Sequence, residues 1–366
     1  MTSLKPPGQI AGQRTVAIHH IERLGSDAVM LQLGIPDGTA LSYEAGQFIA
    51  IHLPCGATRC YSMAHRQQAG APLEFHIRLQ PQGVFSQWLV DALNDAKVLG
   101  RTLSISGPYG DCTWRPLQSS ADMTILLGGG TGIAPLTALL EEGLAQETRG
   151  PITLYWGGRQ PNDFYCAAYF EALARRHQNF RFVPVVDTQD TRWKGRRGFV
   201  QDGAADDFPN LTKANVYACG SPIMVSSARQ KLITQCGLDP DRFYADAFEP
   251  SVSIRDDARS SPRLRVQLQL ADGSERIVQV AAGTSLMSAL RAEGLMQGIC
   301  GGQKSCGSCR IETDAAWSAH LPPPDRIETR LLAALSDPRP ADRLACQIHL
   351  TPALDGLRIA IPDRPL

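Results

Sequence analysis

Four cysteines near the C-terminal end of the chain have the spacing of an iron-sulfur site. The stretch CGGQKSCGSC places Cys300, Cys306 and Cys309 in one short loop rich in Gly and Ser, and Cys346 follows in RLACQI. Thiolates are the usual ligands of such clusters. Zinc and a chance grouping of thiols are the alternatives, but zinc usually takes two C-x2-C pairs or Cys with His. We therefore expect these four cysteines to ligate a 2Fe-2S cluster, with RLACQI an interior strand.

A second chemical signal is the stretch GGGTGIAP, residues 128–135, which lies between an apolar run and a helical pattern. Glycines let a backbone approach a phosphate closely, and the helix N-terminus that follows favours negative charge. A tight strand-to-helix turn without a ligand is the alternative. Downstream, YACGSPIMV gives another apolar strand that ends at Cys219-Gly220 before a helix start. The two turns together predict a nucleotide site.

The composition is that of an ordinary globular protein of two or three domains. The 366 residues are 43% hydrophobic and 20% charged, with a formal net charge of zero. Nothing in this balance calls for nucleic acid or an anionic membrane. The chain shows no signal-peptide pattern and no long apolar run, so we expect a cytoplasmic protein without a membrane partner. We expect the remaining cysteines, among them Cys55, Cys60, Cys112, Cys166 and Cys236, to be reduced thiols.

The elements that must position these residues fall into three groups. Short strands over 16–33, 47–53, 60–64, 73–79 and 103–106, with one helix over 85–93, predict a small antiparallel barrel. From Met123 apolar runs alternate with amphipathic helices, which predicts βαβ units and a parallel sheet. A polar stretch, EPSVSIRDDARSSPR, reads as a linker, and Asp272-Gly273 marks a hairpin beyond it. The expected domains are residues 1–117, 118–249 and 263–366, with a linker at 250–262.

Taken together, residues 12–250 resemble the ferredoxin-NADP reductase family, which pairs a flavin-binding antiparallel β-barrel with a nicotinamide-binding α/β domain. The C-x5-C-x2-C spacing is one residue longer than the plant-type spacing. With RLACQI and LPPPDRIETRLLAAL, it makes residues 263–366 similar to adrenodoxin-type 2Fe-2S ferredoxins, an α+β domain of β-grasp type. The domain order resembles phthalate dioxygenase reductase, and the barrel resembles the benzoate dioxygenase reductase branch.

The resemblance implies roles for the residues of the nucleotide domain. Gly130, Thr131 and Gly132 would hold the pyrophosphate, with Pro135 starting the helix. The nicotinamide pocket would be formed by Cys219, Gly220, Ser221, Pro222 and Met224, and Phe248 would cover one face of the flavin. A buried structural thiol is the alternative for Cys219.

In the barrel, RCYS matches the family's R-x-Y-S flavin motif. Strand alternation puts Arg59 and Tyr61 on one face, and Ser62 can donate toward the flavin ring. GVFS looks like the turn that offers backbone amides to the flavin phosphates. Its members are Gly83, Phe85 and Ser86, and His76 and Arg78 on the preceding strand are further expected flavin contacts. A surface salt bridge for Arg59 and a core role for Phe85 are the alternatives.

The resemblance to the benzoate dioxygenase reductase branch favours FAD over FMN, and resemblance to such reductases suggests NADH, while the residues themselves leave NADH and NADPH open. A 2′-phosphate needs a cation, for which Arg159, Arg196 and Arg197 are candidates. The ribose of NADH needs an acid, and Asp163 and Asp187 are the candidates for it.

Electron counting then predicts a reductase. NADH gives up two electrons as hydride and a 2Fe-2S cluster accepts one, so a flavin between them must hold the surplus. The expected partner is a terminal oxygenase, a Rieske non-haem iron enzyme. A haem-thiolate monooxygenase, a sugar-deoxygenation or radical system and a redox-sensing role stay open. Asp325 and Glu328 are candidates for partner contacts, or else solvated helix charges.

Overall fold

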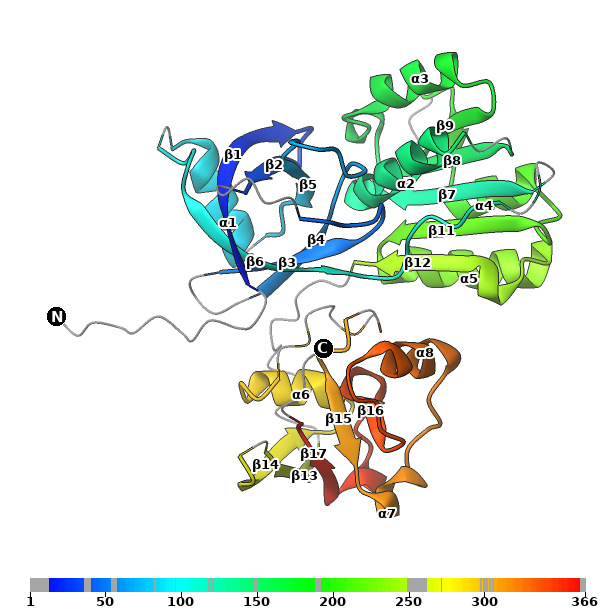
Figure 1. The fold of residues 1–366 in the computed structure, drawn as a ribbon. Coiled ribbons are helices and arrows are strands. Elements are labelled where there is room, and N and C mark those ends of the chain that lie inside the picture. The colour runs from blue at the N-terminus through cyan, green and yellow to red at the C-terminus, as the bar shows by residue number, and fades with distance from the viewer. Residues whose placement is uncertain are drawn as a thin grey trace. The chain divides into compact units, whose positions relative to one another are not determined.

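The computed structural model divides the chain into two compact units, Met1–Glu249 and Pro250–Leu366 (Figure 1). No helix in the described part of the chain is long and apolar enough to cross a membrane. The structure describes residues 13–35, 41–53, 58–81, 83–95, 97–117, 119, 122–147, 150–187, 192–248, 262–270, 272–296, 298, 302, 304 and 306–362.

The first unit begins with a six-stranded antiparallel sheet in the order β4-β3-β6-β1-β2-β5. Its edges meet where the amide of Ala64, just after β4, donates to the carbonyl of Glu74 on β5 at 2.8 Å, so the sheet closes into the expected barrel. The strand expected over 16–33 is in fact two, because Gly25 at φ +56° permits a tight turn. The bounds are β1 (Arg14–Leu24), β2 (Ala28–Gly34), β3 (Phe48–His52), β4 (Thr58–Ser62), β5 (Leu73–Arg78), α1 (Val84–Leu93) and β6 (Thr102–Tyr109).

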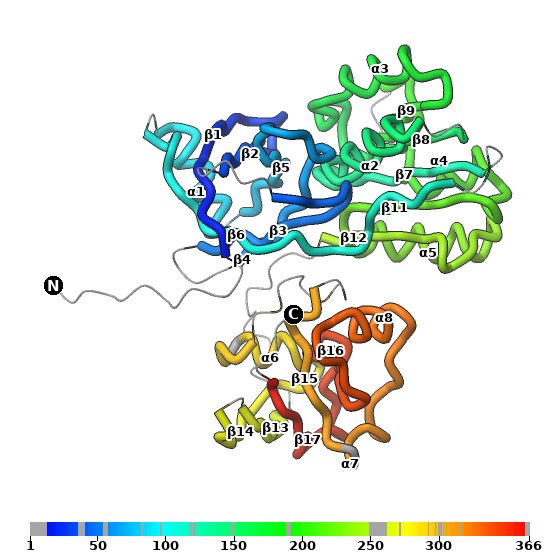
Figure 2. The backbone as a smooth tube through the Cα atoms, in the orientation of Figure 1, coloured from blue at the N-terminus to red at the C-terminus, as the bar shows by residue number. Residues whose placement is uncertain are grey.

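A six-stranded parallel sheet follows in the order β10-β9-β8-β7-β11-β12 (Figure 2). The expected βαβ alternation is confirmed, although α4 and the short edge strands β10 and β12 were not expected from the sequence. The bounds are β7 (Met123–Gly129), η1 (Gly130–Gly132), α2 (Ile133–Ala145), β8 (Ile152–Gly158), η2 (Pro161–Asp163), α3 (Ala167–Arg176), β9 (Phe180–Val186), β10 (Arg196–Arg197), α4 (Val200–Asp207), β11 (Ala214–Gly220), α5 (Pro222–Cys236), η3 (Pro240–Arg242) and β12 (Phe243–Ala247).

Both faces of this sheet are covered, because successive side chains of its strands point to opposite sides. Leu126 of β7 packs in one apolar cluster with residues of α2 and α3, such as Leu136 and Phe170. Its neighbours Ile125 and Leu127 pack in a second cluster with residues of α4 and α5. Helices α2 and α5 begin just after the carboxyl ends of β7 and β11, and ligands of such sheets bind at these strand ends.

The second unit is a five-stranded mixed sheet in the order β14-β13-β17-β15-β16, packed with helices in one core. The hairpin expected at Asp272-Gly273 is confirmed, with Gly273 at φ +81°. The bounds are β13 (Arg263–Gln269), β14 (Glu275–Ala281), α6 (Leu286–Ala292), β15 (Arg310–Thr313), α7 (Ala315–Ser318), α8 (Arg326–Ala334), β16 (Asp342–Leu344), η5 (Ala345–Gln347), η6 (Pro352–Leu354) and β17 (Leu357–Ala360).

The expectation that RLACQI is an interior strand is wrong. Strand β16 is the edge of the sheet and ends at Leu344, and Cys346 lies on the single helical turn η5. The amide of Ala345 donates to the carbonyl of Cys309 at 2.9 Å, which ties this turn to the loop that carries the other thiols.

Glu328 is neither a partner contact nor a solvated helix charge, because its residue is only 2% exposed. Its carboxylate accepts from Nε of Arg343 at 2.9 Å and from the amide of Leu344 at 2.8 Å. Arg343 is also buried. This buried pair holds α8 against β16, three residues before Cys346, so Glu328 supports the thiol-bearing turn.

Replacing Glu328 with Ala should destabilise the second unit by about 3–5 kcal/mol, because it leaves the Arg343 guanidinium buried and unpaired. Urea-dependent hydrogen exchange in β15 and β16 of the full chain measures this change. The control is Glu293→Ala, which removes an exposed ion pair with Arg276 and should cost about 1 kcal/mol or less. Equal effects of the two substitutions would contradict the assignment.

Candidate functional site

Bare backbone forms a seam where β7 and β11 end side by side. A Cβ on Gly132 would lie 2.1 Å from the carbonyl oxygen of Cys219, so no larger residue fits there. A Cβ on Gly220 would lie 3.2 Å from the amide nitrogen of Gly129, and Gly130 has φ +54°. The missing side chains leave backbone open to a ligand, as the expected nucleotide site requires.

Helix α2 rises directly from this seam. It begins at Ile133, two residues before the expected start at Pro135, and no side chain caps its first turn. Thr131 is buried in η1, and the carbonyl of Gly130 accepts from the indole Nε1 of Trp156 at 2.9 Å. The uncapped amides and the positive end of the helix dipole therefore face the seam and suit a pyrophosphate.

The residues expected around the nicotinamide lie together on the far side of the seam. Cys219 is fully buried, and a hydrogen bond with the Cys112 thiol, together with burial, raises the pKa of its thiol well above the ordinary range. The amide of Phe248 donates to the carbonyl of Gly220 at 2.7 Å. Ser221 caps α5 by accepting from the amide of Met224 at 3.3 Å. Cys219 is thus a neutral thiol beside the seam.

The R-x-Y-S strand reaches the same place from the barrel. Ser62 is buried and donates to Oδ2 of Asp246 on β12 at 3.1 Å. Strand register pairs Asp246 with Cys219. Asp246 was not singled out from the sequence, although an acid inside the apolar strand FYADA, two residues before Phe248, was a usable signal. It joins the barrel motif to the nicotinamide side.

The other barrel residues form a second uncapped helix start. No side chain caps α1 after Gly83, and the hydroxyl of Ser86 folds back to accept from the amide of Gln80 at 2.9 Å. Phe85 is buried, and its ring lies 5.7 Å from that of Tyr61 in the R-x-Y-S motif. Arg59 donates to the carbonyl of Thr58 at 2.8 Å. A helix N-terminus without a side-chain cap suits a phosphate of a dinucleotide.

His76 and Arg78 of β5 point toward the nucleotide domain. His76 is engaged by Oε1 of Glu74 and the hydroxyl of Tyr165, each at 3.1 Å. Arg78 pairs with Asp27 at 2.9 Å, and its Nη1 would be 3.8 Å from a Cβ on Gly130. Arg78 therefore lies beside the glycine-rich turn that follows β7.

The residues expected to distinguish NADH from NADPH differ in exposure and in whether their charges are already paired. Asp163 accepts from the backbone amides of Arg159 and Gln160, so its carboxylate is already satisfied. Arg196 pairs with Asp206 and Asp207. Arg159 lies exposed just after β8, and its guanidinium has no partner within the described part of the chain. Asp187 is also exposed after β9, whereas Arg197 donates to the carbonyl of Trp193.

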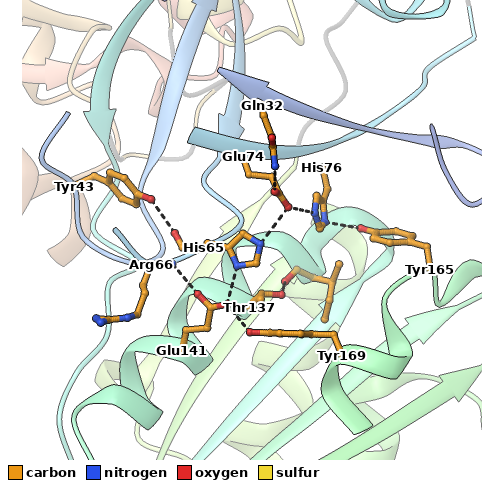
Figure 3. A network of polar contacts seen from close by, with 11 residues as sticks. Gln32, Tyr43, His65, Arg66, Glu74, His76, Thr137, Glu141, Tyr165 and Tyr169 are labelled. Atoms are coloured by element: carbon orange, nitrogen blue, oxygen red, sulfur yellow. Dashed lines mark hydrogen bonds and ion pairs between the residues drawn. The ribbon is translucent and has the colours of Figure 1, made fainter. Parts of the chain in front are cut away.

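A polar network ties the barrel to the nucleotide domain (Figure 3). Nδ1 of His65 lies 2.7 Å from Glu141 on α2, and Nε2 lies 3.1 Å from Glu74 on β5. Glu141 also accepts from the Tyr169 hydroxyl at 2.6 Å and from the amide of Arg66 at 3.0 Å. Nothing in the sequence alone paired these residues.

The charges of this network support one another. Burial by itself would lower the pKa of His65, but the hydrogen bonds with Glu141 and Glu74 outweigh it and raise the pKa to about 10. Burial would raise the pKa of each carboxyl, yet contact with His65 holds both the Glu74 and the Glu141 pKa below the ordinary range. The network is therefore an imidazolium between two carboxylates at neutral pH.

Three of the four cluster cysteines lie buried in the second unit, and Cys300 falls outside the described residues. A hydrogen bond with Cys346, together with burial, raises the pKa of the Cys309 thiol. Sγ of Cys306 lies 3.0 Å from the hydroxyl of Ser308. The side-chain amide Nε2 of Gln347 donates to Sγ of Cys346 at 3.2 Å. Among the described residues, no three His, Cys, Asp or Glu side chains are placed so that they could hold a metal ion together. Buried soft thiols that receive hydrogen bonds fit an iron-sulfur cluster.

Comparison with known proteins agrees with these three sites. The Oxidoreductase FAD-binding domain matches residues 15–114, the Oxidoreductase NAD-binding domain residues 126–230, and the 2Fe-2S iron-sulfur cluster binding domain residues 270–351.

Relatives and a solved structure match over about two thirds of the chain. CDP-6-deoxy-L-threo-D-glycero-4-hexulose-3-dehydrase reductase of Yersinia pestis is 35% identical over 63% of this chain and 67% of its own. Terephthalate 1,2-dioxygenase reductase component 2 of Comamonas sp. is 33% identical over 61% of this chain and 64% of its own. The crystal structure of an Amycolatopsis cytochrome P450 reductase has a TM-score of 0.58 and 30% identity, covering 66% of this chain and 72% of its own.

The chain therefore belongs to the phthalate dioxygenase reductase-like family of flavin- and NAD-binding reductases with a 2Fe-2S domain. It is an FAD-dependent NAD(P)H oxidoreductase that passes electrons through flavin to a 2Fe-2S cluster, and its cofactors are FAD, NADH and that cluster. Flavin supplies the step between hydride and single electrons.

Gly132→Ala should abolish NAD⁺ binding and leave the flavin bound, because the added Cβ must push η1 away from Cys219 and open the seam. Equilibrium titration with NAD⁺ and the visible flavin spectrum measure the two effects. Gly34→Ala is the control, since a Cβ there meets nothing closer than 4.0 Å. Unchanged NAD⁺ affinity in the Gly132 variant would contradict the site.

The network also predicts how stability depends on pH. The pKa of His65 is raised from 6.5 to about 10, so its contribution is complete below pH 6.5 and is lost as the pH rises through 10. The lowered pKa values of Glu74 and Glu141 give a contribution present above pH 4.5 and lost in stronger acid. The stability difference between wild type and His65→Gln, from thermal unfolding, should shrink from pH 6 to pH 10. A difference independent of pH would refute this account.

Proposed function

We propose that this chain is the cytoplasmic reductase component of a Rieske non-haem iron oxygenase. FAD is held by the barrel motifs and NADH by the seam, with Phe248 on the flavin face and Arg159 at the adenosine end. The domains are residues 1–117, 118–249 and 263–366, joined by 250–262. The roles are divided as follows: FAD contacts from Arg59, Tyr61, Ser62, His76, Arg78, Gly83, Phe85 and Ser86; NADH contacts from Gly130, Thr131, Gly132, Pro135, Cys219, Gly220, Ser221 and Met224; cluster ligands from Cys300, Cys306, Cys309 and Cys346.

The sign of the charge on α8 supports this partner over a haem-thiolate monooxygenase. The charges of both acids are already paired, since Glu328 is buried with Arg343 and the exposed N-cap residue Asp325 pairs with Lys304 of the cluster loop. The exposed residues of α8 include Arg326 and Arg330, and the others are the uncharged Ile327, Thr329, Ala333 and Ala334. Acidic steering of the adrenodoxin kind therefore has no basis on this helix, and an acidic partner surface fits it better.

A deoxysugar dehydrase is the second candidate partner. It is favoured by the 35% identity to the Yersinia pestis dehydrase reductase over 231 residues. That match describes the reductase core, and the partner is reached from the cluster, so the identity bears less directly on the partner than the α8 surface does.

Single-turnover electron transfer tests the choice. The NADH-reduced protein is mixed with an oxidised Rieske oxygenase, a haem-thiolate monooxygenase or a sugar dehydrase, and cluster reoxidation is followed by visible absorbance. The proposal expects the fastest transfer to the Rieske protein. Faster transfer to either of the others would overturn it.

Arg330→Glu should slow transfer to the oxygenase, because it replaces the exposed positive charge of α8 with a negative one. The effect should weaken as salt rises, since exposed charges more than about 10 Å apart are largely screened at 0.1 M ionic strength. The control is Arg263→Glu on β13, toward the opposite edge of the sheet from β16. Equal slowing by both variants would contradict a role for α8.

A further inference from the structure

His65 occupies a position that demands a positive charge. Each of its ring nitrogens faces a carboxylate, Glu141 at 2.7 Å and Glu74 at 3.1 Å (Figure 3). Ionised carboxylates only accept hydrogen bonds, so both nitrogens must carry protons. The geometry therefore requires the imidazole of His65 to be doubly protonated and positively charged.

The two carboxylates belong to different domains of the first unit. Glu74 is on β5 of the barrel and also accepts from Nε2 of Gln32 at 2.8 Å. Glu141 is on α2 of the nucleotide domain. The surrounding groups are all satisfied: His76 bonds Glu74 and Tyr165, Tyr169 and the Arg66 amide bond Glu141, and the Tyr43 hydroxyl donates to the carbonyl of His65. A fully satisfied charged network rigidifies the elements that it joins.

The contacts of His65 with Glu74 and Glu141, called the His65 clamp below, join the end of β4 to α2. These are the two elements whose spacing would govern hydride transfer. His65 comes three residues after Ser62, at the end of the flavin strand β4. Glu141 is on the helix that begins at Ile133, immediately after the pyrophosphate loop. The segment from Ser62 to His65 is also held at Ser62, whose hydroxyl donates to Asp246. Movement of α2 relative to β4 would therefore move one cofactor against the other.

We propose that His65, held between Glu74 and Glu141, is a positioning residue for hydride transfer that fixes the nicotinamide cradle against the flavin strand. The inference rests on the cofactor sites proposed above. Misplacement of reacting atoms by about 1 Å can cost about 100-fold in rate. The residue touches neither cofactor in this account and acts through α2 and β4.

The test uses the holoprotein and stopped-flow reduction of the flavin by NADH. His65→Gln keeps a donor but loses the charge and one of the two bonds. Its limiting rate of flavin reduction should fall about 10- to 100-fold, with a large isotope effect from 4-deuterated NADH. Flavin content and the NADH concentration for half-maximal rate should change little, because binding is retained. The long-wavelength absorbance of the stacked nicotinamide-flavin complex should weaken in parallel.

The matched control is His20→Gln, which breaks an exposed histidine–glutamate contact on β1 of the same barrel. Glu141→Gln removes the opposite charge with little change of shape, and it carries the test if His65→Gln yields no folded holoprotein. The double variant should be no slower than the slower single variant, since both break one clamp.

The outcomes distinguish failure of the positioning role from failure of the proposed function. If wild type transfers hydride and both His65→Gln and Glu141→Gln keep its rate and absorbance band, the positioning role is overturned, even where their unfolding temperature falls. If NADH does not reduce the flavin of the wild type, the proposed function itself fails.

Discussion

Hydride moves only between atoms that are nearly in contact, so everything in the first unit depends on how closely two domains hold two cofactors. The backbone contact of Gly132 with Cys219 holds the two strand ends together and keeps side chains out of the nucleotide seam. The bond from Ser62 to Asp246 brings the flavin strand to that seam. The His65 clamp then fixes the helix that rises from it. The glycine seam leaves space for the cofactors, and the polar contacts around it hold the two domains in place.

The second unit meets a different constraint, because it must hold thiols on loops and a single helical turn rather than on strands. Its solution is a buried ion pair, Glu328 with Arg343, placed just before Cys346. Satisfying that acid inside the core removes it from the surface of α8. Because this acid is buried, the exposed charges of α8 are those of Arg326 and Arg330, so the pairing that supports Cys346 also sets the sign of the charge on the α8 surface.

The sequence predicted the three-domain architecture, because alternation of apolar residues, glycine turns and cysteine spacing are local signals. The family resemblance placed Cys219 and Gly220 beside the nicotinamide and Phe248 on the flavin, and in the structure the amide of Phe248 donates to the carbonyl of Gly220. The sequence could not predict His65 with Glu141, which are 76 residues apart. It misjudged Glu328, because burial of an acid depends on a partner arginine from another element. Long-range charge pairing leaves no mark in a single sequence.

The central claim is that one polypeptide converts hydride into single electrons through flavin and a 2Fe-2S cluster in series. Anaerobic mixing with one equivalent of NADH, followed by visible absorbance and rapid-freeze electron paramagnetic resonance, tests it most directly. The account predicts that the flavin bleaches first and that the cluster signal of one unpaired electron grows at the expense of reduced flavin. A flavin that is reduced while the cluster stays oxidised would contradict it.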